Sequence, residues 1–582
     1  MLLAFGADAA DPATRGSAAA EAATEPAYRV VINAPSALRA AVERSVGLVR
    51  WQTYADMTVE LLDRLAREAI DEARDAAAAE GYFSALVDVS IDRGTKPAVV
   101  TLTVTSGDAT RIAAVRIDVT GPATRDVPLG TAAIAKLREE WSLPAGEVFR
   151  QTAWSSAKER ALATLRASPF AAATIVRSAA EIDPDTRTGD LSLALESGPA
   201  FRFGDMEIVG LAKYHPSIVR NYSSIRRGEP YGEAPLEQFV RRLNATGYFS
   251  SVQAAIDPDT SHPDDATVRV AVIEAPTRSF EGGVGYSTDV RSTAKINYRD
   301  VNVDGKGLQM LVDGQLDSRT QSGSLRLVQP ANESGWIGTW ALGAKRTDIE
   351  GLVTDTASAG TRWHTLEERR ERAASATYYL DDQTPEGAPA IRSRALYLEA
   401  EQYWREVDHL LAPTRGFMAS VQFGGGIPGV STRGFGRVIG RFAGWIPLDR
   451  ATQLNIRGEA GAVLAPARDG IPSTLLFRTG GDTTVRGYAF ESLGVDQGNA
   501  IVGGRYFTAA SVEAIRWIGE SWGLAAFVDA GNAGDSLPDF RLALGYGVGA
   551  RIRTPLGPFR LDVAYGQDVR EVRLHFSVGL SF

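Results

Sequence analysis

The feature that most constrains this fold is an apolar–polar alternation that runs through the second half of the chain. At the C-terminus, Val572, Leu574, Phe576, Val578, Leu580 and Phe582 alternate with Arg573, His575, Ser577, Gly579 and Ser581. A period of two places the two sets of side chains on opposite faces of a β-strand. Segments 541–552 and 559–566 show the same period. A chain that ends on such a strand fits a closed barrel, in which the last strand must find a partner.

Sixteen candidate strands can be placed between residues 277 and 582. They begin near residues 278, 293, 306, 322, 335, 358, 372, 391, 415, 431, 452, 501, 522, 541, 558 and 572. This spacing suits membrane strands of about ten residues with their connections. Seven of the ten tryptophans lie in this half, as aromatic girdles at the two membrane interfaces would require. The alternative is a soluble β-sandwich or propeller, but the blade repeat of about 40–50 residues is not seen.

The first half of the chain carries a unit that recurs three times. Its marker segments are GYFSALVDVS at 81–90, SPFAAATIVR at 168–177 and GYFSSVQAAI at 247–256. Each copy has a short strand and a helical stretch before the marker and two alternating strands after it. The sequence therefore predicts α+β modules, three β-α-α-β-β repeats, followed by a 16-stranded antiparallel transmembrane barrel. The predicted boundaries are 27–107, 108–198, 199–276 and 277–582.

The modules and the leader leave alternatives open. An exposed sheet edge in each module can receive an extended partner strand, although any one module can equally be a rigid spacer. Acidic turns such as 183–190 lack the EF-hand pattern, so no metal site is predicted. Residues 1–26 are predicted to be a disordered leader or the remnant of an export signal, because only Leu2 to Phe5 resemble the apolar region of such a signal and no basic residue precedes them.

Composition and motifs exclude several classes of function. The 582 residues hold 62 Lys+Arg against 71 Asp+Glu, a net charge of −9, which argues against a nucleic-acid binder. No apolar run approaches the roughly 18–20 residues of a membrane helix. Cysteine is absent, which excludes disulfides and thiolate chemistry and suits an envelope protein. The five histidines are scattered, and neither a nucleophile elbow nor a phosphate loop appears, so neither an enzyme nor a cofactor is predicted.

A long connection at about 466–500 separates two strong strands and contains GGDTTVRGY from Gly480. Loops of this length without periodicity are usually functional or disordered. Its adjacent glycines and its Arg-Gly-Tyr tip favour a defined conformation that folds back. A guanidinium away from water needs an acidic partner, and Asp529 is a candidate because alternation places it on the lumen face. The alternative is an exposed loop arginine.

Two groups of strand glycines are also notable. Gly545, Gly547 and Gly549 share one strand face and leave space for something inside the lumen. The first and last strands, which must meet to close the cylinder, carry Gly282, Gly283, Gly285 and Gly579, and the last strand ends at Phe582. Because glycine weakens strand order, this lateral seam is the predicted place for the barrel to open without ATP.

With these motifs, the chain from about residue 27 resembles the BamA/TamA superfamily of outer-membrane assembly barrels. The repeats resemble POTRA domains, Val485-Arg-Gly-Tyr resembles the VRG[FY] tip of the sixth extracellular loop, and Phe527-Val-Asp-Ala-Gly resembles the F-x-D-x-G strand motif. The resemblance implies that the loop arginine reaches into the barrel toward the strand aspartate. Its loop residues are Gly480, Gly481, Val485, Arg486, Gly487 and Tyr488, and its lumen partners are Phe527, Asp529 and Gly531.

The number of modules indicates a branch of this superfamily. Three modules are similar to the TamA branch, because BamA-like members have five and two-partner secretion transporters usually have two. The resemblance implies a Gram-negative outer-membrane location with periplasmic modules, a TamB-like inner-membrane-anchored partner, unfolded outer-membrane or autotransporter clients, and contact with outer-membrane lipid. Alternatives are a two-partner secretion transporter for one adhesin or haemolysin, or a passive porin or receptor. The missing or truncated export signal and Ser168-Pro-Phe in the middle repeat depart from the family pattern.

Overall fold

The computed structural model describes residues 26–126, 128–287, 291–367, 369–410, 412–519, 521–554 and 557–581. The predicted leader therefore lies outside the described residues, apart from its last position. The chain divides into two compact units, one holding the first two modules and the other the barrel with most of the third module. Within the described residues, no helix is long and apolar enough to cross a membrane.

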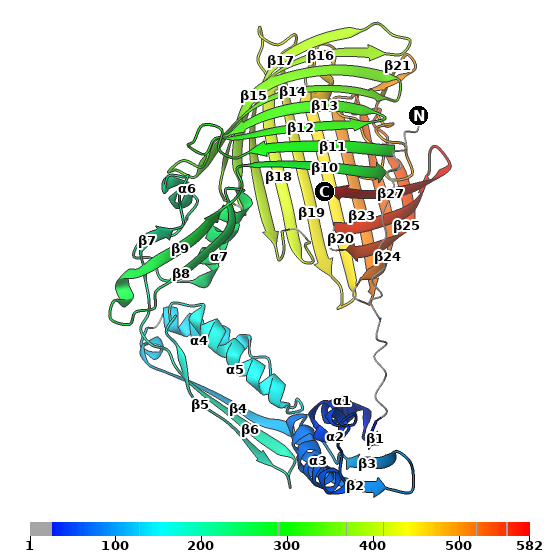
Figure 1. The fold of residues 1–582 in the computed structure, drawn as a ribbon. Helices are drawn as coiled ribbons and strands as arrows, with labels where there is room; N and C mark the ends of the chain where they lie inside the picture. Colours follow the sequence, from blue (N-terminus) through cyan, green and yellow to red (C-terminus); the bar gives the residue numbers. More distant parts are fainter. Residues whose placement is uncertain are drawn as a thin grey trace, which may run out of the picture. The chain divides into compact units, whose positions relative to one another are not determined.

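The first module is a three-stranded sheet with helices between its first two strands (Figure 1). Its elements are β1 (Tyr28–Asn33), α1 (Ser36–Ser45), α2 (Gly47–Arg50), α3 (Val59–Ala79), β2 (Leu86–Asp92) and β3 (Ala98–Thr105). The strand order is β1-β3-β2, with β1 parallel to β3. Helix α3 begins after Thr58, whose hydroxyl accepts a bond from the Leu61 amide, and its alanine-rich face is buried in a core that includes Val100 and Leu102 of β3.

The second and third modules repeat this topology, with strand orders β4-β6-β5 and β7-β9-β8. The second comprises β4 (Arg111–Thr120), η1 (Pro122–Thr124), α4 (Leu129–Glu139), α5 (Gln151–Arg166), β5 (Thr174–Asp183) and β6 (Thr188–Glu196). The third comprises β7 (Phe203–Val209), α6 (Ser217–Arg220), α7 (Glu233–Ala245), β8 (Phe249–Ile256), η2 (Pro263–Asp265) and β9 (Ala266–Glu274). The predicted β-α-α-β-β modules are thus confirmed.

The glycine of the marker segment has a backbone role. Gly81 adopts a φ of +94°, and a Cβ there would lie 2.2 Å from the carbonyl oxygen of Phe149. Gly247 in the third module likewise has a positive φ, of +78°, whereas Ser168 in the second does not. The middle repeat lacks the marker glycine because its turn does not use the left-handed conformation.

The second half forms a closed barrel whose described strands number sixteen (Figure 1). They are β10 (Arg278–Ser287), β11 (Arg291–Asp300), β12 (Gln309–Asp317), β13 (Thr320–Val328), β14 (Trp336–Ile349), β15 (Leu352–Thr365), β16 (Arg372–Pro385), β17 (Ile391–Val407), β18 (Gly416–Gly426), β19 (Phe435–Pro447), β20 (Thr452–Leu464), β23 (Tyr506–Ile518), β24 (Trp522–Gly534), β25 (Ala543–Thr554), β26 (Gly557–Gly566) and β27 (Glu571–Ser581). Neighbouring strands are antiparallel throughout, so the predicted barrel is confirmed.

Two strand starts differ most from prediction. Strand β15 begins at Leu352 rather than near 358, because Thr354, Asp355 and Thr356 interrupt the apolar alternation after its first two residues. Strand β23 begins at Tyr506 rather than near 501, because residues 500–502 belong to a separate hairpin in the preceding loop.

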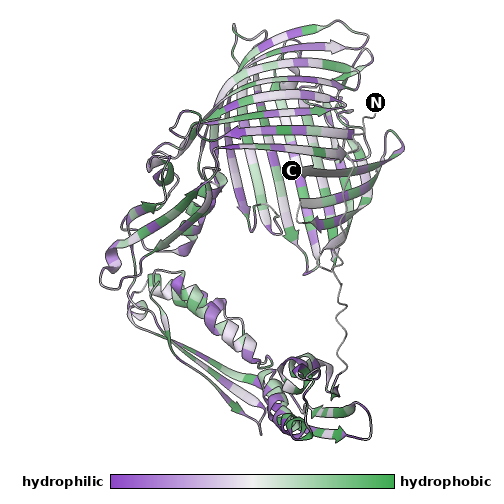
Figure 2. Ribbon diagram, viewed as in Figure 1, coloured by the Kyte–Doolittle hydropathy of each residue, from purple (hydrophilic) through white to green (hydrophobic). Residues whose placement is uncertain are grey.

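The outer surface of the barrel is apolar and the wall is uneven in height. Outward side chains such as Leu342, Val528 and Val548 are more than half exposed, and hydrophobic and hydrophilic residues alternate along the strands (Figure 2). At the end that joins the modules, outward aromatic rings form edge and stacked pairs, Trp340 with Trp363 and Phe417 with Phe442, as an interfacial girdle requires.

The height of the barrel wall varies around its circumference. Strands β10 to β13 have nine or ten residues, whereas β14 to β17 have 14 to 17.

The third module is joined to the barrel through the marker segment. The fully buried Tyr248 hydroxyl donates to the Gly307 carbonyl at 2.6 Å, and the Gln309 side chain donates to the Thr246 carbonyl at 2.9 Å. Asn221, which follows helix α6, donates to the carbonyl of Ala331 in the connection between β13 and β14 at 2.8 Å. These bonds hold the module against the turns that precede β12 and β14.

Replacement of Tyr248 by phenylalanine is expected to loosen this junction by about 1–3 kcal/mol, because the Gly307 carbonyl would lose its buried donor. Burial raises the pKa of Tyr248, so the hydroxyl stays protonated at neutral pH. Its contribution is lost only as the pH rises above the ordinary tyrosine value of about 10. Hydrogen exchange at residues 303–308 in both proteins measures the effect, and unchanged exchange would contradict it.

Candidate functional site

The connection between β20 and β23, residues 465–505, folds back into the barrel and is called the lumenal loop. It contains η3 (Ser473–Leu475), β21 (Val495–Gln497) and β22 (Ala500–Val502). Its apolar residues Ile471, Leu475 and Phe477 are buried in a cluster with barrel side chains. The Phe477 ring stacks on Phe507 of β23 at 5.2 Å between centroids. Since this is the sixth connection on the side away from the modules, the predicted inward fold of the sixth loop is observed.

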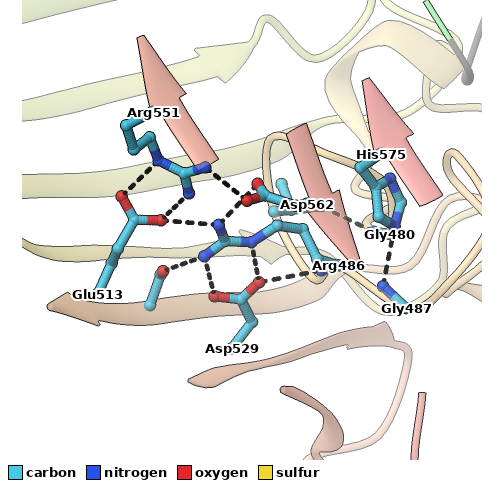
Figure 3. Close-up of polar contacts among 10 residues, drawn as sticks. Gly480, Arg486, Gly487, Glu513, Asp529, Arg551, Asp562 and His575 are labelled. Atoms are coloured by element: carbon cyan, nitrogen blue, oxygen red, sulfur yellow. Dashed lines mark hydrogen bonds and ion pairs between the residues drawn. The ribbon is translucent and has the colours of Figure 1, made fainter. Parts of the chain in front are cut away.

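The structure brings Arg486, at the tip of the lumenal loop, together with Asp529 of β24 (Figure 3). The guanidinium forms a two-point pair with the carboxylate, Nε to Oδ2 at 2.7 Å and Nη2 to Oδ1 at 2.9 Å. The Arg486 backbone amide donates to the same carboxylate at 3.1 Å. Arg486 is only 4% exposed and Asp529 is fully buried. The alternative of an exposed loop arginine is therefore wrong.

The pair belongs to a wider charge cluster with members on β23, β24, β25 and β26 (Figure 3). Arg486 Nη1 also contacts Glu513 of β23 at 2.8 Å and Asp562 of β26 at 3.1 Å. Arg551 of β25 bridges the same two carboxylates. Two arginines thus neutralise most of the charge of three carboxylates, and every member has direct partners, which is the condition for burying charge at tolerable cost.

The F-x-D-x-G motif has a physical explanation in this site. Phe527, Asp529 and Gly531 alternate on β24, so all three face the lumen, whereas Val528 between them is 55% exposed on the outside. The Phe527 ring lies 3.3 Å from the Arg486 guanidinium carbon, a cation–π contact. At Gly531 a Cβ would lie 2.9 Å from a Val485 methyl carbon. The motif supplies a stacking face, a carboxylate and a space for the loop.

The three lumen-facing glycines of β25 provide the rest of the space, as the sequence predicts. A Cβ at Gly545 would lie 1.9 Å from the Arg486 carbonyl oxygen, and one at Gly547 would lie 2.7 Å from the Phe527 ring. A Cβ at Gly549 would lie 1.8 Å from an Asp562 carboxylate oxygen. The missing side chains are therefore replaced by the loop tip and its partners.

The remaining motif residues shape and anchor the tip. Gly480 and Gly481 have φ values of +108° and +101°, and the Gly480 amide donates to the Thr484 hydroxyl at 2.9 Å. The Gly487 amide donates to His575 Nε2 of β27 at 3.0 Å (Figure 3). The buried Tyr488 hydroxyl lies 3.1 Å from both the Leu544 carbonyl and an Asp568 carboxylate oxygen. The loop tip is thus held by the strands β24 to β27.

Sequence reasoning missed part of this site. Glu513, Arg551, Asp562 and His575 each occupy a polar position of an alternating strand, which predicts a lumen-facing side chain and nothing more. A charged residue on the polar face of four neighbouring strands is the signal that could have suggested a cluster. Within the described residues, no group of three His, Asp or Glu side chains could hold a metal ion.

The predicted lateral seam is the pairing of β10 with β27. The register places Gly283 opposite Ser581 and Gly285 opposite Gly579. Five residue pairs, 283–287 with 577–581, make this pairing, whereas ten join β10 to β11. Phe582 lies outside the described residues.

A closed sixteen-stranded barrel with an arginine-anchored inward loop, preceded by α+β modules, defines a class of outer-membrane barrels that carry soluble modules. The model of the Omp85 superfamily domain matches residues 302–582, the model of the surface antigen variable number repeat (POTRA) matches residues 201–274, and the model of the first POTRA domain of TamA matches residues 32–106. The barrel is thus an Omp85 superfamily domain and is preceded by POTRA domains, the arrangement found in the BamA/TamA group. The chain is an outer-membrane protein with its POTRA modules in the periplasm.

Relatives and solved structures agree with this assignment. The outer membrane protein assembly factor BamA of Neisseria meningitidis serogroup B is 24% identical over 339 residues, 53% of this chain and 42% of that protein. BamA of Nitratidesulfovibrio vulgaris is 27% identical over 414 residues, 64% of this chain and 50% of that protein. The chain thus spans about half the length of these curated relatives. The crystal structure of BamA from Haemophilus ducreyi lacking POTRA domains 1–3 shares the fold, with a TM-score of 0.57 at 18% identity over 81% of this chain and 100% of that one.

Proposed function

We propose that this protein inserts or translocates outer-membrane proteins, including autotransporter-type clients, through the β10–β27 seam. The observation that carries the proposal is the short seam, in which five pairs of described residues join β10 to β27, whereas ten join β10 to β11. A strand edge with free backbone groups is a template for an incoming strand. The process requires neither ATP nor covalent chemistry, so we do not propose an enzyme.

The wall height near the seam supports the same proposal. Strands β10 to β13 are nine or ten residues long, whereas strands β14 to β17 are 14 to 17 residues long. A short hydrophobic wall thins the surrounding bilayer at a modest cost in free energy. Lipid beside the seam would therefore resist an emerging strand less than lipid beside the taller wall.

A passive porin is less well supported, because the lumenal loop occupies the barrel interior. The tip reaches β24 to β27 and is buried there. Beside the tip remains a cavity of about 340 Å³, whose lining includes Trp445, Arg457 and Arg560. Conductance with solute selectivity, together with normal client assembly after deletion of the gene, would favour the porin over the proposal.

The TamA-type role is the finer part of the proposal. It is supported by the match of the first module to the TamA-type POTRA model and by the three modules, each with sheet edges that can receive a strand. We propose a TamB-like inner-membrane-anchored protein as the partner of these modules. Capture of such a protein by the full-length chain from crosslinked membranes tests this. Capture of one large secreted adhesin or haemolysin instead would favour a two-partner secretion transporter.

A disulfide between Gly285→Cys and Gly579→Cys tests the seam. These positions lie directly opposite each other, where antiparallel Cα atoms are close enough to bridge. We expect client assembly in reconstituted membranes to fall at least about tenfold when the bridge forms, and to recover on reduction. The chain has no native cysteine to interfere.

The matched control is a disulfide between Ala344→Cys and Ala357→Cys, which are register partners in β14 and β15, away from the seam. This bridge is expected to leave assembly unchanged. Normal client assembly by the protein with the seam bridge would contradict the lateral route.

A further inference from the structure

We propose that Asp381 of β16 is a second positioning residue for the lumenal loop, and that its bond to Ser473 is the anchor that yields when the seam opens. The first anchor, Arg486 on Asp529, holds the loop tip to β24, which lies six strands further along the barrel. The loop would then be a strap with these two anchors on different walls, besides the contacts of Arg468 with Asp535 and of Arg478 with the Ile349 carbonyl. The anchor itself is a structural claim, whereas its coupling to opening rests on the proposed lateral seam.

The Asp381 carboxylate is buried and receives five hydrogen bonds. It is 2% exposed. The loop supplies two donors, the Ser473 amide and the Ser473 hydroxyl, both at 2.8 Å. The barrel supplies the others, from Thr356 at 2.7 Å, Gln383 at 2.9 Å and Ser393 at 3.5 Å. The five donors satisfy both oxygens of this buried carboxylate.

Strand register explains how the barrel prepares this receptor. Thr356 on β15 and Ser393 on β17 lie directly opposite Asp381 in the two neighbouring strands. All three side chains therefore point to the same face of the sheet, the lumen. Gln383, two residues further on β16, lies on the same face and also donates to the Ile471 carbonyl of the loop at 3.2 Å. The wall thus presents a preformed set of groups to the segment that contains Ser473.

The local conformation of the loop presents Ser473 to this receptor. Pro472 has a φ of −54° and an extended ψ of 137°, and Ser473 opens the 3₁₀ turn η3. The same turn directs Leu475 into the apolar cluster of the lumen, next to Phe477. The bond to Asp381 therefore fixes where the loop enters the lumen, before the chain reaches the tip.

The two anchors differ in chemistry. Among the described residues, Asp381 forms no ion pair and all its donors are neutral. Arg486 instead joins two unlike charges in a forked pair, the stronger kind of bond. The tip is bound to β24, β26 and β27, the last of which forms the seam with β10. Outward movement of these strands would therefore pull on the strap. The bond between Asp381 and Ser473, whose donors are neutral, is the weaker of the two anchors.

Two substitutions of Ser473 remove first one and then both of the donors that the loop offers to Asp381. Ser473→Ala removes the hydroxyl and keeps the amide. Ser473→Pro removes both, and the backbone tolerates it, because proline suits the first residue of a helical turn and the preceding residue is already extended. Ser492→Ala is the matched control, since the Ser492 hydroxyl donates to Ala489 within the same loop and not to the wall.

Hydrogen exchange on the full-length protein tests the anchor and the coupling separately. In Ser473→Pro we expect exchange at residues 474–477 to rise by about tenfold or more, with a smaller rise in Ser473→Ala and none in Ser492→Ala. Exchange at residues 283–287 of the seam is expected to rise several-fold in the same order. Exchange at the tip, residues 485–488, should not change.

Each outcome has a distinct meaning. Unchanged exchange at 474–477 in Ser473→Pro would overturn Asp381 as an anchor. Increased exchange there with an unchanged seam would overturn the coupling, and would leave the lateral route to be judged by the seam disulfide alone. A rise at the tip equal to that at 474–477 would show one continuous loop structure and would overturn the two-anchor strap.

Discussion

Replacement of Arg486 by alanine is expected to destabilise the folded barrel by about 3–5 kcal/mol, the usual cost of removing one partner from a buried ion pair. Asp529 is fully buried and would lose its two-point ion pair. Glu513 and Asp562 would share Arg551 alone. The measurement is the temperature at which the compact barrel unfolds in semi-native electrophoresis, together with protease cleavage of the loop tip.

Arg486→Lys separates charge from geometry. Lysine keeps the charge but cannot form the forked pair with Asp529 or stack a flat guanidinium on Phe527, so we expect an intermediate loss. The control is Arg346→Ala, which removes an ion pair with Asp355 that is about half exposed on the outer surface and is expected to change stability by about 0–1 kcal/mol. Equal effects of Arg486→Ala and Arg346→Ala would show that the lumen cluster contributes no more than a surface pair.

Replacement of Gly545 by alanine is expected to expel the loop tip from its site. The new Cβ would lie 1.9 Å from the Arg486 carbonyl oxygen, which is a backbone atom and cannot rotate away. Overpacking alone costs about 1–3 kcal/mol, and displacement of the tip adds the loss of the arginine pair. We expect new protease cleavage within residues 481–488 and a loss of client assembly while the barrel still forms.

Gly458→Ala is the control for Gly545→Ala. Gly458 lies in β20, and a Cβ there meets no atom within 4 Å. Alanine is intrinsically better than glycine inside a strand by about 0.5–1 kcal/mol, so this variant is expected to be as stable as the natural chain or slightly more stable. A protected loop tip in Gly545→Ala, as in the control, would contradict the close-approach explanation for the β25 glycines.

The fold was largely predictable because its elements have strong periodic signals. Each barrel strand has one face toward lipid and one toward the lumen, so alternation reveals the strand and its approximate start. The strand starts that the sequence predicts least accurately are those of β15 and β23. In the first, Thr354, Asp355 and Thr356 interrupt the apolar alternation, and in the second, strand-like residues pair within the loop.

The site was predictable from the sequence only at residues that belong to a recognisable motif. Arg486, Phe527 and Asp529 stand in recognisable segments, whereas Asp381 and Ser473 stand in none. Their pairing depends on the register of β15, β16 and β17 and on the path of a loop that begins some 80 residues later. Periodicity says that Asp381 faces the lumen but not what meets it there.

The sequence by itself determined the three modules, the sixteen strands, the lumen-facing sides of β24 and β25 and the glycine-rich seam. These follow from local rules, the two-residue period of a strand and the turns that separate strands. Only the tertiary structure decided which charges meet, because Arg486, Glu513, Asp529, Arg551 and Asp562 are brought together by barrel closure and by the inward fold of one loop. Because these charges are buried, each is stable only beside its partners, and no single segment of the sequence predicts which partners it meets.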